Sequence, residues 1–197
     1  QVAHQKPGRY QFALPFSLQL ARPPNQKRPP RPCQSLPRNR RLAIMMRLGL
    51  SLAVLVAVLD QLSKWAVLEL FMDPPRVIKL LPFLDLVLVY NRGASFGFLN
   101  MSAQWVPWLL TAIAIVVVIV LLVWLRRAEN RVLAAALGLI IGGAVGNGVD
   151  RVMRDRHAVV DFIDIYVGAY HWPAFNVADS AIVVGVIILL LDGWLLL

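Results

Sequence analysis

The sequence predicts an all-α polytopic membrane protein with four membrane-spanning helices. Hydrophobic residues make up 58% of the 197 residues and the mean hydropathy is +0.64, which is far more apolar than a soluble domain. The chain also contains long apolar runs of the length that a bilayer requires, separated by polar connections. These runs cover residues 48–70, 105–125, 132–149 and 176–197.

The charge distribution divides the chain into two parts. Residues 1–44 hold nine of the twenty Lys and Arg residues, eight of the thirteen prolines and no Asp or Glu. The other eleven basic residues are matched by eleven acidic ones, so residues 45–197 are neutral and we expect no nucleic-acid partner. A segment this rich in Pro and Arg cannot bury enough apolar surface to fold, so we expect 1–44 to be disordered.

The origin of this extension leaves two interpretations open. Met45 and Met46 directly precede the first apolar run, which favours natural translation from one of them, with 1–44 outside the natural protein. In the alternative interpretation, 1–44 is a basic arm that contacts anionic lipid.

The first apolar run carries Asp60 and Lys64, which are four residues apart and therefore share one face of a helix. A removable signal peptide would not contain such a pair, so we expect residues 48–70 to be a permanent span. The two residues either form an interfacial ion pair that ends the span or belong to a functional site.

The region that follows, residues 71–104, breaks the helical pattern. Residues 77–89 mix β-branched and apolar residues in short runs split by Pro82, which predicts a few short strands at the membrane surface. Asn91 and Gly93 come next and predict a turn.

The second and third runs are expected to pack closely. Trp105 and Trp108 are typical interfacial anchors of the second. In the third, glycines recur every four residues and let a neighbouring helix approach along one face. A polar group continues that face at the end of the run, either as helix-end capping and packing or as part of a site. The residues concerned are Gly138, Gly142 and Gly146, followed by Asn147, Asp150 and Arg151.

The last part of the chain places aspartates at the threshold of the fourth run. Asp161 and Asp164 lie in what we read as a polar connection, 152–174, and Asn176 and Asp179 are three residues apart where the run begins. An aspartate is costly in lipid, so it indicates a function. We expect Asp164 to be a loop or interfacial residue.

The connector 126–131 carries three Arg residues, which favours the cytoplasmic side and places both termini there. With four alternating spans, every polar cluster then falls at the extracytoplasmic face. Packing accidents would scatter over both faces, so this convergence indicates one shared site.

The residue types in these clusters favour an aspartic protease without a metal. Cys33, the only cysteine, lies in the extension, and the three histidines have no metal-ligand spacing. Ser63 and Lys64 are adjacent and point to different helix faces, which disfavours a Ser–Lys pair. Two close aspartates share a proton, so that one can activate water while the other donates to the carbonyl oxygen. Asp161 and Asp179 are the expected pair.

Five motifs in order resemble the lipoprotein signal peptidases, or signal peptidase II family, of bacterial aspartyl proteases. They cover residues 45–197 and not the extension. The motifs are Asp60-Gln-Leu-Ser-Lys64, Asn91-Arg-Gly-Ala-Ser-Phe96, Gly142-Gly-Ala-Val-Gly-Asn147 with Asp150-Arg151, Val159-Val-Asp161-Phe-Ile-Asp164 and Phe175-Asn-Val-Ala-Asp179.

The resemblance implies four transmembrane helices, with a small extracytoplasmic β-cradle and a short helix between the first two. It implies cleavage of prolipoproteins just before a diacylglyceryl-modified cysteine, in the bacterial inner membrane, by Asp161 and Asp179. It implies no cofactor and no metal, membrane lipid as a partner and a monomer. Residues that would support the pair or the substrate are Asp60, Lys64, Asn91, Gly93, Asn147, Asp150, Arg151, Asn176 and Ala178.

Two departures from the family pattern are Ser95, where Ala is common, and a slightly long Asp150-to-Asp161 link with Ala158 in place of Gly. The alternative class is a small proton- or ion-coupled transporter, because intramembrane charges also mark ion paths. A transporter would need polar residues along a whole path or inverted repeats, and the sequence has neither. A membrane scaffold would suit the glycine row but would leave the aspartates unexplained.

Overall fold

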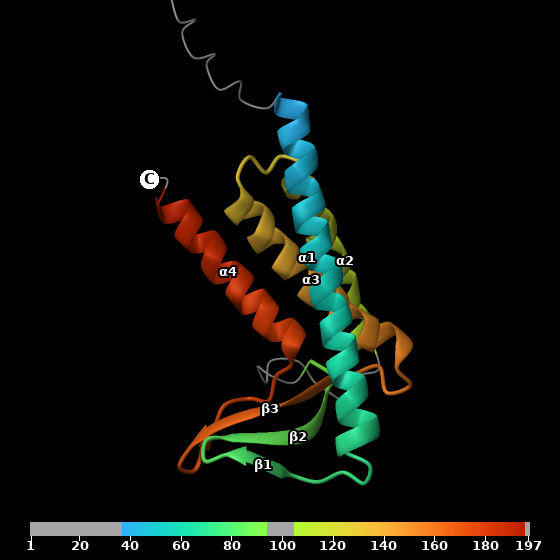
Figure 1. Ribbon diagram of the computed structural model, residues 1–197. Coiled ribbons are helices and arrows are strands. Elements are labelled where there is room, and N and C mark those ends of the chain that lie inside the picture. Colours follow the sequence, from blue (N-terminus) through green and yellow to red (C-terminus); the bar gives the residue numbers. More distant parts are fainter. Residues whose placement is uncertain (1–36, 94–104, 196–197) are drawn as a thin grey trace, which may run out of the picture. The chain divides into compact units, whose positions relative to one another are not determined.

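The chain divides into two units, and the second, Leu36–Leu197, contains the helices with a small sheet at one end (Figure 1). The structure is a computed structural model, and it describes residues 37–93 and 105–195, with side chains to 193. Residues 1–36 lie outside the described part, so the disorder expected for this portion of the extension stays a prediction. Ser95 and any short helix over 94–104 lie outside it as well.

Four long helices form the body of this unit. They are α1 (Arg38–Ala66), continued by the π-helical turn η1 (Val67–Phe71), α2 (Val106–Leu125), α3 (Arg131–Met153) and α4 (Val177–Leu195). The first helix begins at Arg38 and not at residue 48, so residues 38–44, which we assigned to the disordered extension, are helical. They lie three residues before the apolar run, and residues 38–47 contain no Gly or Pro that would end a helix.

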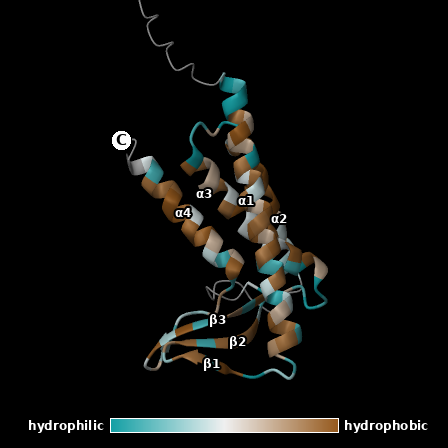
Figure 2. Cartoon of the chain, viewed as in Figure 1, coloured by the Kyte–Doolittle hydropathy of each residue, from teal (hydrophilic) through white to brown (hydrophobic). Residues whose placement is uncertain are grey.

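Within the described residues, three helices are long and apolar enough to cross a membrane: Arg38–Phe71, Val106–Leu125 and Arg131–Met153. Hydrophobic residues dominate the middle of the helices (Figure 2). Many remain exposed, such as Val116 and Ile119 on α2. Large apolar side chains exposed over a whole helix face are what a lipid environment stabilises.

Helix α3 lies at the centre and packs against α1, α2 and α4. Its glycines make this possible, as expected: a side chain at Gly138 or Gly142 would collide with the α1 backbone at Gly49 or Ala53. Gly143 faces the other way and gives the same close approach to Ala178 on α4. Close backbone packing of this kind brings α1 and α4 to the two sides of α3.

The sheet has four antiparallel strands in sequential order: β1 (Ile78–Leu81), β2 (Leu84–Asn91), β3 (Val159–Val167) and β4 (Tyr170–His171). The strands expected in 77–89 are therefore present. The expected polar connection, 152–174, is wrong in its centre, because β3 and β4 occupy it. Half of the sheet thus comes from the link between α3 and α4, and the cradle does not lie wholly between the first two helices.

Strand β3 connects the sheet to the helices at both of its ends. It pairs with β2 in a register that sets Asp161 opposite Val89 and Asp164 opposite Asp85. Its apolar residues Val160 and Phe162 pack on Val67 at the end of α1. The chain then returns along β3, with hydrogen bonds between Ile163 and Phe175, and enters α4. Asp161 is thereby held next to the first turn of α4.

Candidate active site

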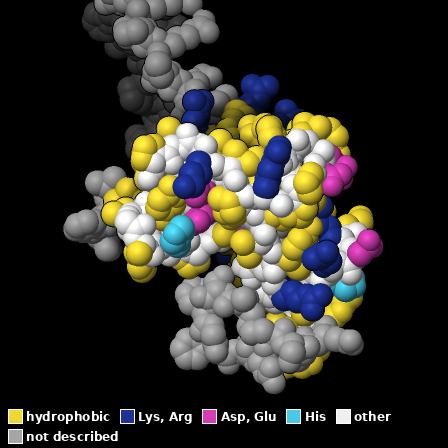
Figure 3. All heavy atoms as spheres, turned by 90° about the horizontal axis from the view of Figure 1, so that it is seen from below, with side chains coloured by type: hydrophobic (Ala, Val, Ile, Leu, Met, Phe, Trp, Pro, Cys, Tyr) yellow, Lys and Arg dark blue, Asp and Glu magenta, His cyan; other side chains and the backbone are white. Residues whose placement is uncertain are grey.

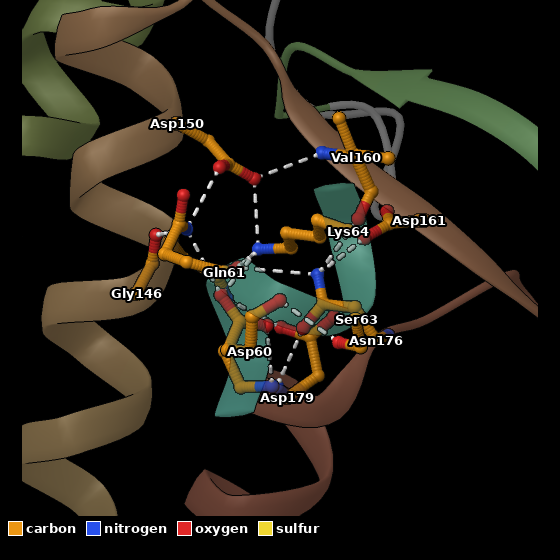
Figure 4. A network of polar contacts seen from close by, with 12 residues as sticks. Asp60, Gln61, Ser63, Lys64, Gly146, Asp150, Val160, Asp161, Asn176 and Asp179 are labelled. Atoms are coloured by element: carbon orange, nitrogen blue, oxygen red, sulfur yellow. Dashed lines mark hydrogen bonds and ion pairs between the residues drawn. The ribbon is translucent and has the colours of Figure 1, made fainter. Parts of the chain in front are cut away.

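A buried lysine forms the centre of the polar cluster where the helices meet the sheet (Figure 4). The Lys64 Nζ donates to Asp60 Oδ2 at 2.8 Å, to Asp150 Oδ2 at 2.7 Å and to Asn147 Oδ1 at 3.1 Å. The Lys64, Asp60 and Asp150 side chains are all 0% exposed. Three acceptors match the three N–H groups of an ammonium, so this buried cation is fully satisfied.

Asp150 joins three further groups to this cation. Its Oδ1 accepts hydrogen bonds from Gln61 Nε2 at 3.0 Å and Arg154 Nε at 2.9 Å. Its Oδ2 accepts the backbone N–H of Val160 at 3.1 Å. Asp150 therefore fixes the start of β3 on the end of α3, directly before Asp161.

Asp60 makes the corresponding link to α4. Its Oδ1 accepts the backbone N–H of Ala178 at 3.0 Å, and so satisfies a donor in the first turn of that helix. The carboxylate fits because position 146 is glycine: an added Cβ there would lie 2.6 Å from Asp60 Oδ2. The Asp60–Lys64 pair is thus buried between helices and does not simply end the span at an interface.

Asn176 holds both of the aspartates that we expect to act together. Its Nδ2 donates to Asp161 Oδ1 at 2.7 Å, and its backbone N–H donates to Asp179 Oδ2 at 3.2 Å. Its Oδ1 accepts the backbone N–H of Asp179 at 2.9 Å. Asn176 is fully buried, so its position and that of the two carboxylates are coupled.

Two more amides complete the contacts of the pair. Asn147 Nδ2 donates to Asp179 Oδ1 at 2.7 Å, and its Oδ1 also accepts from Asn176. Asn91 Nδ2 donates to Asp161 Oδ2 at 2.9 Å. Each carboxylate therefore receives N–H bonds on both of its oxygens, from residues on β2, α3 and the start of α4.

The two carboxylates differ in their surroundings. Asp161 is almost fully buried, whereas Asp179 is half-buried and lies in the first turn of α4. Burial raises the pKa of Asp161 to about 6, and the nearby Asp179 carboxylate adds to the increase, while hydrogen bonds from Asn91 and Asn176 act in the opposite direction. A pair with unequal environments can hold one proton on a preferred member.

The remaining expected residues lie at the edge of this network. Arg151 Nη1 donates to the Asn147 carbonyl at 3.3 Å, and its buried Nε has no partner among the described residues. Gly93 has a φ of 113° and donates its N–H to Asn91 Oδ1 at 2.8 Å. A left-handed backbone suits glycine, so this turn orients Asn91 toward Asp161. In the link between Asp150 and Asp161, His157 has a positive φ of 47°. Ala158, the residue after it, is fully buried.

The structure also contains features that the sequence analysis missed. Gln61 bonds to Asp150 and to the Gly146 carbonyl, and so connects α1 to α3. Gln61 lies within the Asp60–Lys64 motif, and this position could have indicated its part in the network. Asp164 lies on β3, largely buried, with His171 Nδ1 at 2.7 Å from its Oδ2, and is not a loop residue. Ser63 donates to the Asp60 carbonyl and has no contact with the Lys64 amine.

The cation at the centre of the described part of the site is the Lys64 ammonium. No group of three His, Cys, Asp or Glu residues suited to a metal ion occurs in the described ranges, 37–93 and 105–193. The position between Asp60 and Asp150 is filled by the Lys64 ammonium.

Comparison with known proteins yields one family. The family model described as signal peptidase (SPase) II matches residues 52–195. A lipoprotein signal peptidase of Burkholderia thailandensis is 45% identical over 144 residues, which cover 73% of this chain and 85% of the relative. One of Paraburkholderia phymatum is 44% identical over the same length. Two solved structures of a bacterial membrane enzyme, at 2.3 Å and 1.9 Å resolution, match with a TM-score of 0.63 and 31% identity. Each covers 73% of this chain, and 85% and 90% of the solved chains are matched.

Proposed function

Because the chain belongs to the signal peptidase II family, we propose that it removes the signal peptide from lipid-modified prolipoproteins, with Asp161 and Asp179 as the pair that activates water. The observation that supports this assignment most directly is the contact of Asn176 with both carboxylates, at 2.7 Å and 3.2 Å. One residue thus sets the separation of two acids that must act on the same peptide bond.

The different surroundings of the two acids suggest their roles. Asp161, with a pKa raised to about 6 by burial, is the member of the pair that holds the proton at pH values below about 6. Asp179 lies at the N-terminal end of a helix, where a negative charge is favoured, and acts as the base. Asp179 takes a proton from water as the water oxygen attacks the scissile carbonyl. Asp161 donates its proton to the carbonyl oxygen. As the C–N bond breaks, Asp179 gives the proton that it took from water to the leaving nitrogen, and the former carbonyl oxygen returns its proton to Asp161.

The substrate fits the position of the site in the fold. The cut lies before a diacylglyceryl-modified cysteine, whose acyl chains hold the scissile bond at the membrane surface. The carboxylates lie where apolar helices meet the sheet. We propose α4, with Val183, Val184 and Ile187 exposed, as the fourth span. Both termini then lie in the cytoplasm, the site lies near the extracytoplasmic face of the inner membrane, and the enzyme acts as a monomer in contact with lipid.

The proposal is tested with purified protein and a diacylglyceryl prolipoprotein. Asp161→Asn and Asp179→Asn should each abolish cleavage, because either change leaves the pair without its acid or its base. Asp155→Asn serves as the matched control, since Asp155 is an exposed residue of the same α3–β3 region. The unlipidated precursor is the substrate control, and a chelator should leave the rate unchanged.

Cleavage by either variant at the parent rate would overturn the assignment of the pair. Loss of cleavage in Asp155→Asn as well would show that the assay responds to general damage. Both catalytic variants should retain the far-UV circular dichroism and the elution volume of the parent, so that lost activity is not lost folding.

A further inference from the structure

The outer end of the sheet carries an exposed apolar patch that the reaction does not use. In the β1–β2 hairpin, Leu80 and Leu81 at the end of β1 and Phe83 in the turn are exposed. In the β3–β4 hairpin, Val167 at the end of β3, Tyr170 on β4 and Trp172 just after it are exposed. Val167 is 79% exposed. A hydrogen bond from the Tyr166 N–H to the Phe83 carbonyl, 3.0 Å, ties the two turns together. We call these six side chains the apolar tip.

The sequence of these turns is unusual for hairpins in water. Turns at a solvated surface are normally polar, yet residues 80–84 and 165–170 contain no charged residue. His171 follows, but its Nδ1 lies 2.7 Å from Asp164 Oδ2 and its ring stacks on Tyr166. The His171 ring therefore contacts Asp164 and Tyr166 on β3. The six side chains that form the surface of the tip are apolar or aromatic.

The two faces of β1 differ in polarity. Ile78 and Leu80 line an apolar cavity of about 340 Å³ together with Phe71 at the end of the first helix. Lys79 lies between them and, because side chains alternate along a strand, points to the opposite face. Figure 3, viewed from the sheet end of the molecule, shows Lys and Arg side chains interspersed with hydrophobic ones. Lys79 thus lies on the face of β1 opposite to the apolar cavity.

The position of the tip identifies what covers it. The sheet lies across the end of the helices, and its hairpins extend sideways past the end of α4 that joins the sheet (Figure 1). The α4 surface that follows is itself apolar and exposed, at Val183, Val184 and Ile187. A tip that projects beside a membrane-spanning helix lies over lipid, and Trp and Tyr side chains are enriched at that depth.

We propose that the apolar tip is inserted in the interfacial layer of the outer leaflet and holds the sheet against the membrane beside the site. This inference rests on the topology given with the proposed function, which puts the sheet at the extracytoplasmic surface, and does not require the cleavage reaction itself. The partner is the lipid surface itself, contacted by the six side chains of the apolar tip from the β1–β2 and β3–β4 hairpins.

Spin labels measure the depth of the tip directly. Replacement of the single cysteine, Cys33→Ser, gives a parent for single-cysteine variants in lipid bilayers. Val167→Cys probes the tip, Lys79→Cys is the matched control on the outer face of the same sheet, and Ile119→Cys on α2 is the lipid-facing reference. Collision rates of each label with oxygen, which partitions into lipid, and with a water-soluble nickel chelate are compared.

The label at 167 should resemble the label at 119, with oxygen favoured over nickel, and the label at 79 should show the reverse order. Nickel access at 167 equal to that at 79 would overturn the inference, and so would shielding from both reagents, which would indicate a protein contact. Cleavage of diacylglyceryl prolipoprotein in the same bilayers separates the two proposals. Active protein with a water-exposed label at 167 rejects the inference alone, whereas a lipid-exposed label on inactive protein leaves the inference standing and rejects the proposed function.

Discussion

Asp161 is the residue whose titration can be followed most simply. Burial raises its pKa to about 6, so it holds its proton below that pH and loses it above. If Asp161 is the acid of the pair, the rate of cleavage should fall as the pH rises through about 6. The measurement is kcat as a function of pH on a lipidated substrate.

Asn91→Ala should move this fall to higher pH. Asn91 donates a hydrogen bond to the Asp161 carboxylate at 2.9 Å and thereby favours its ionised form. Without that donor the carboxyl group ionises less readily, and its pKa rises further. A shift of the basic limb to lower pH, or no basic limb at all in the parent, would contradict the role assigned to Asp161.

Lys64 should be the most sensitive residue for stability. Lys64→Met removes the cation from between Asp60 and Asp150, which are both fully buried, and should cost about 3–5 kcal/mol of unfolding free energy. Unfolding in mixed micelles measures the loss. Lys79→Met, at an exposed position, is the matched control and should change little.

Neutralising the two carboxylates together with Lys64 should restore part of this stability, because no uncompensated buried charge remains. The variant that tests this combines Lys64→Met with Asp60→Asn and Asp150→Asn. If Lys64→Met were as stable as the Lys79→Met control, the contacts of Lys64 with Asp60 and Asp150 would contribute little to the free energy of unfolding.

Helix packing makes the Gly146 position sensitive to substitution. Gly146→Ala should lower both stability and activity, because the new Cβ would lie 2.6 Å from Asp60 Oδ2 and displace the side chain that binds the Ala178 N–H. Overpacking of this kind typically costs about 1–3 kcal/mol.

The same helix offers a control two residues away. A Cβ at Gly148 would meet nothing within 4 Å. Gly148→Ala should therefore leave activity unchanged and stabilise the helix by up to about 1 kcal/mol, since alanine has the higher helix propensity. Equal losses in Gly146→Ala and Gly148→Ala would show that the helix itself, and not the fit around Asp60, is the sensitive feature.

The helices could be predicted from the sequence, whereas strand β3 could not. Apolar length gave the helices, and the four-residue glycine spacing gave the face of α3 that packs on α1, because both are local periodic patterns. Strand β3 was missed because its Val-Val-Asp-Phe-Ile-Asp pattern does not alternate simply between two faces. Its pairing with β2 joins residues about seventy positions apart, as in the Asn91–Asp161 bond, and local periodicity holds no information about such a partner.

Within the site, the sequence identified which side chains would meet but not how. Spacing alone placed Asp60, Asn147 and Asn176 near one membrane face. It could not show that Lys64 would have three acceptors, or that Asn176 would bond with both aspartates, since those contacts depend on side-chain geometry between α1, α3, β3 and the start of α4. Gln61 was missed for the same reason.

For the whole molecule, the proposed topology can be tested with a membrane-impermeant thiol reagent on intact cells whose outer membrane has been permeabilised. In the Cys33→Ser parent, Lys79→Cys on the sheet should be labelled, because the sheet is proposed to face the periplasm. Arg127→Cys, exposed in the α2–α3 connection, should be labelled only after lysis. The opposite result would invert the orientation, and labelling of both would indicate damaged cells or a mixed topology.

The bond between Asp60 and Ala178 joins residues 118 positions apart. Helix α1 leaves the ribosome before α4, so the Asp60 carboxylate lacks this hydrogen-bond partner until α4 has been made. Asp179, the second aspartate of the proposed pair, lies one residue beyond that contact. If this pair is catalytic, the same step of biosynthesis completes both the polar network and the active site, and a nascent chain that stops before α4 carries only Asp161 of the two acids.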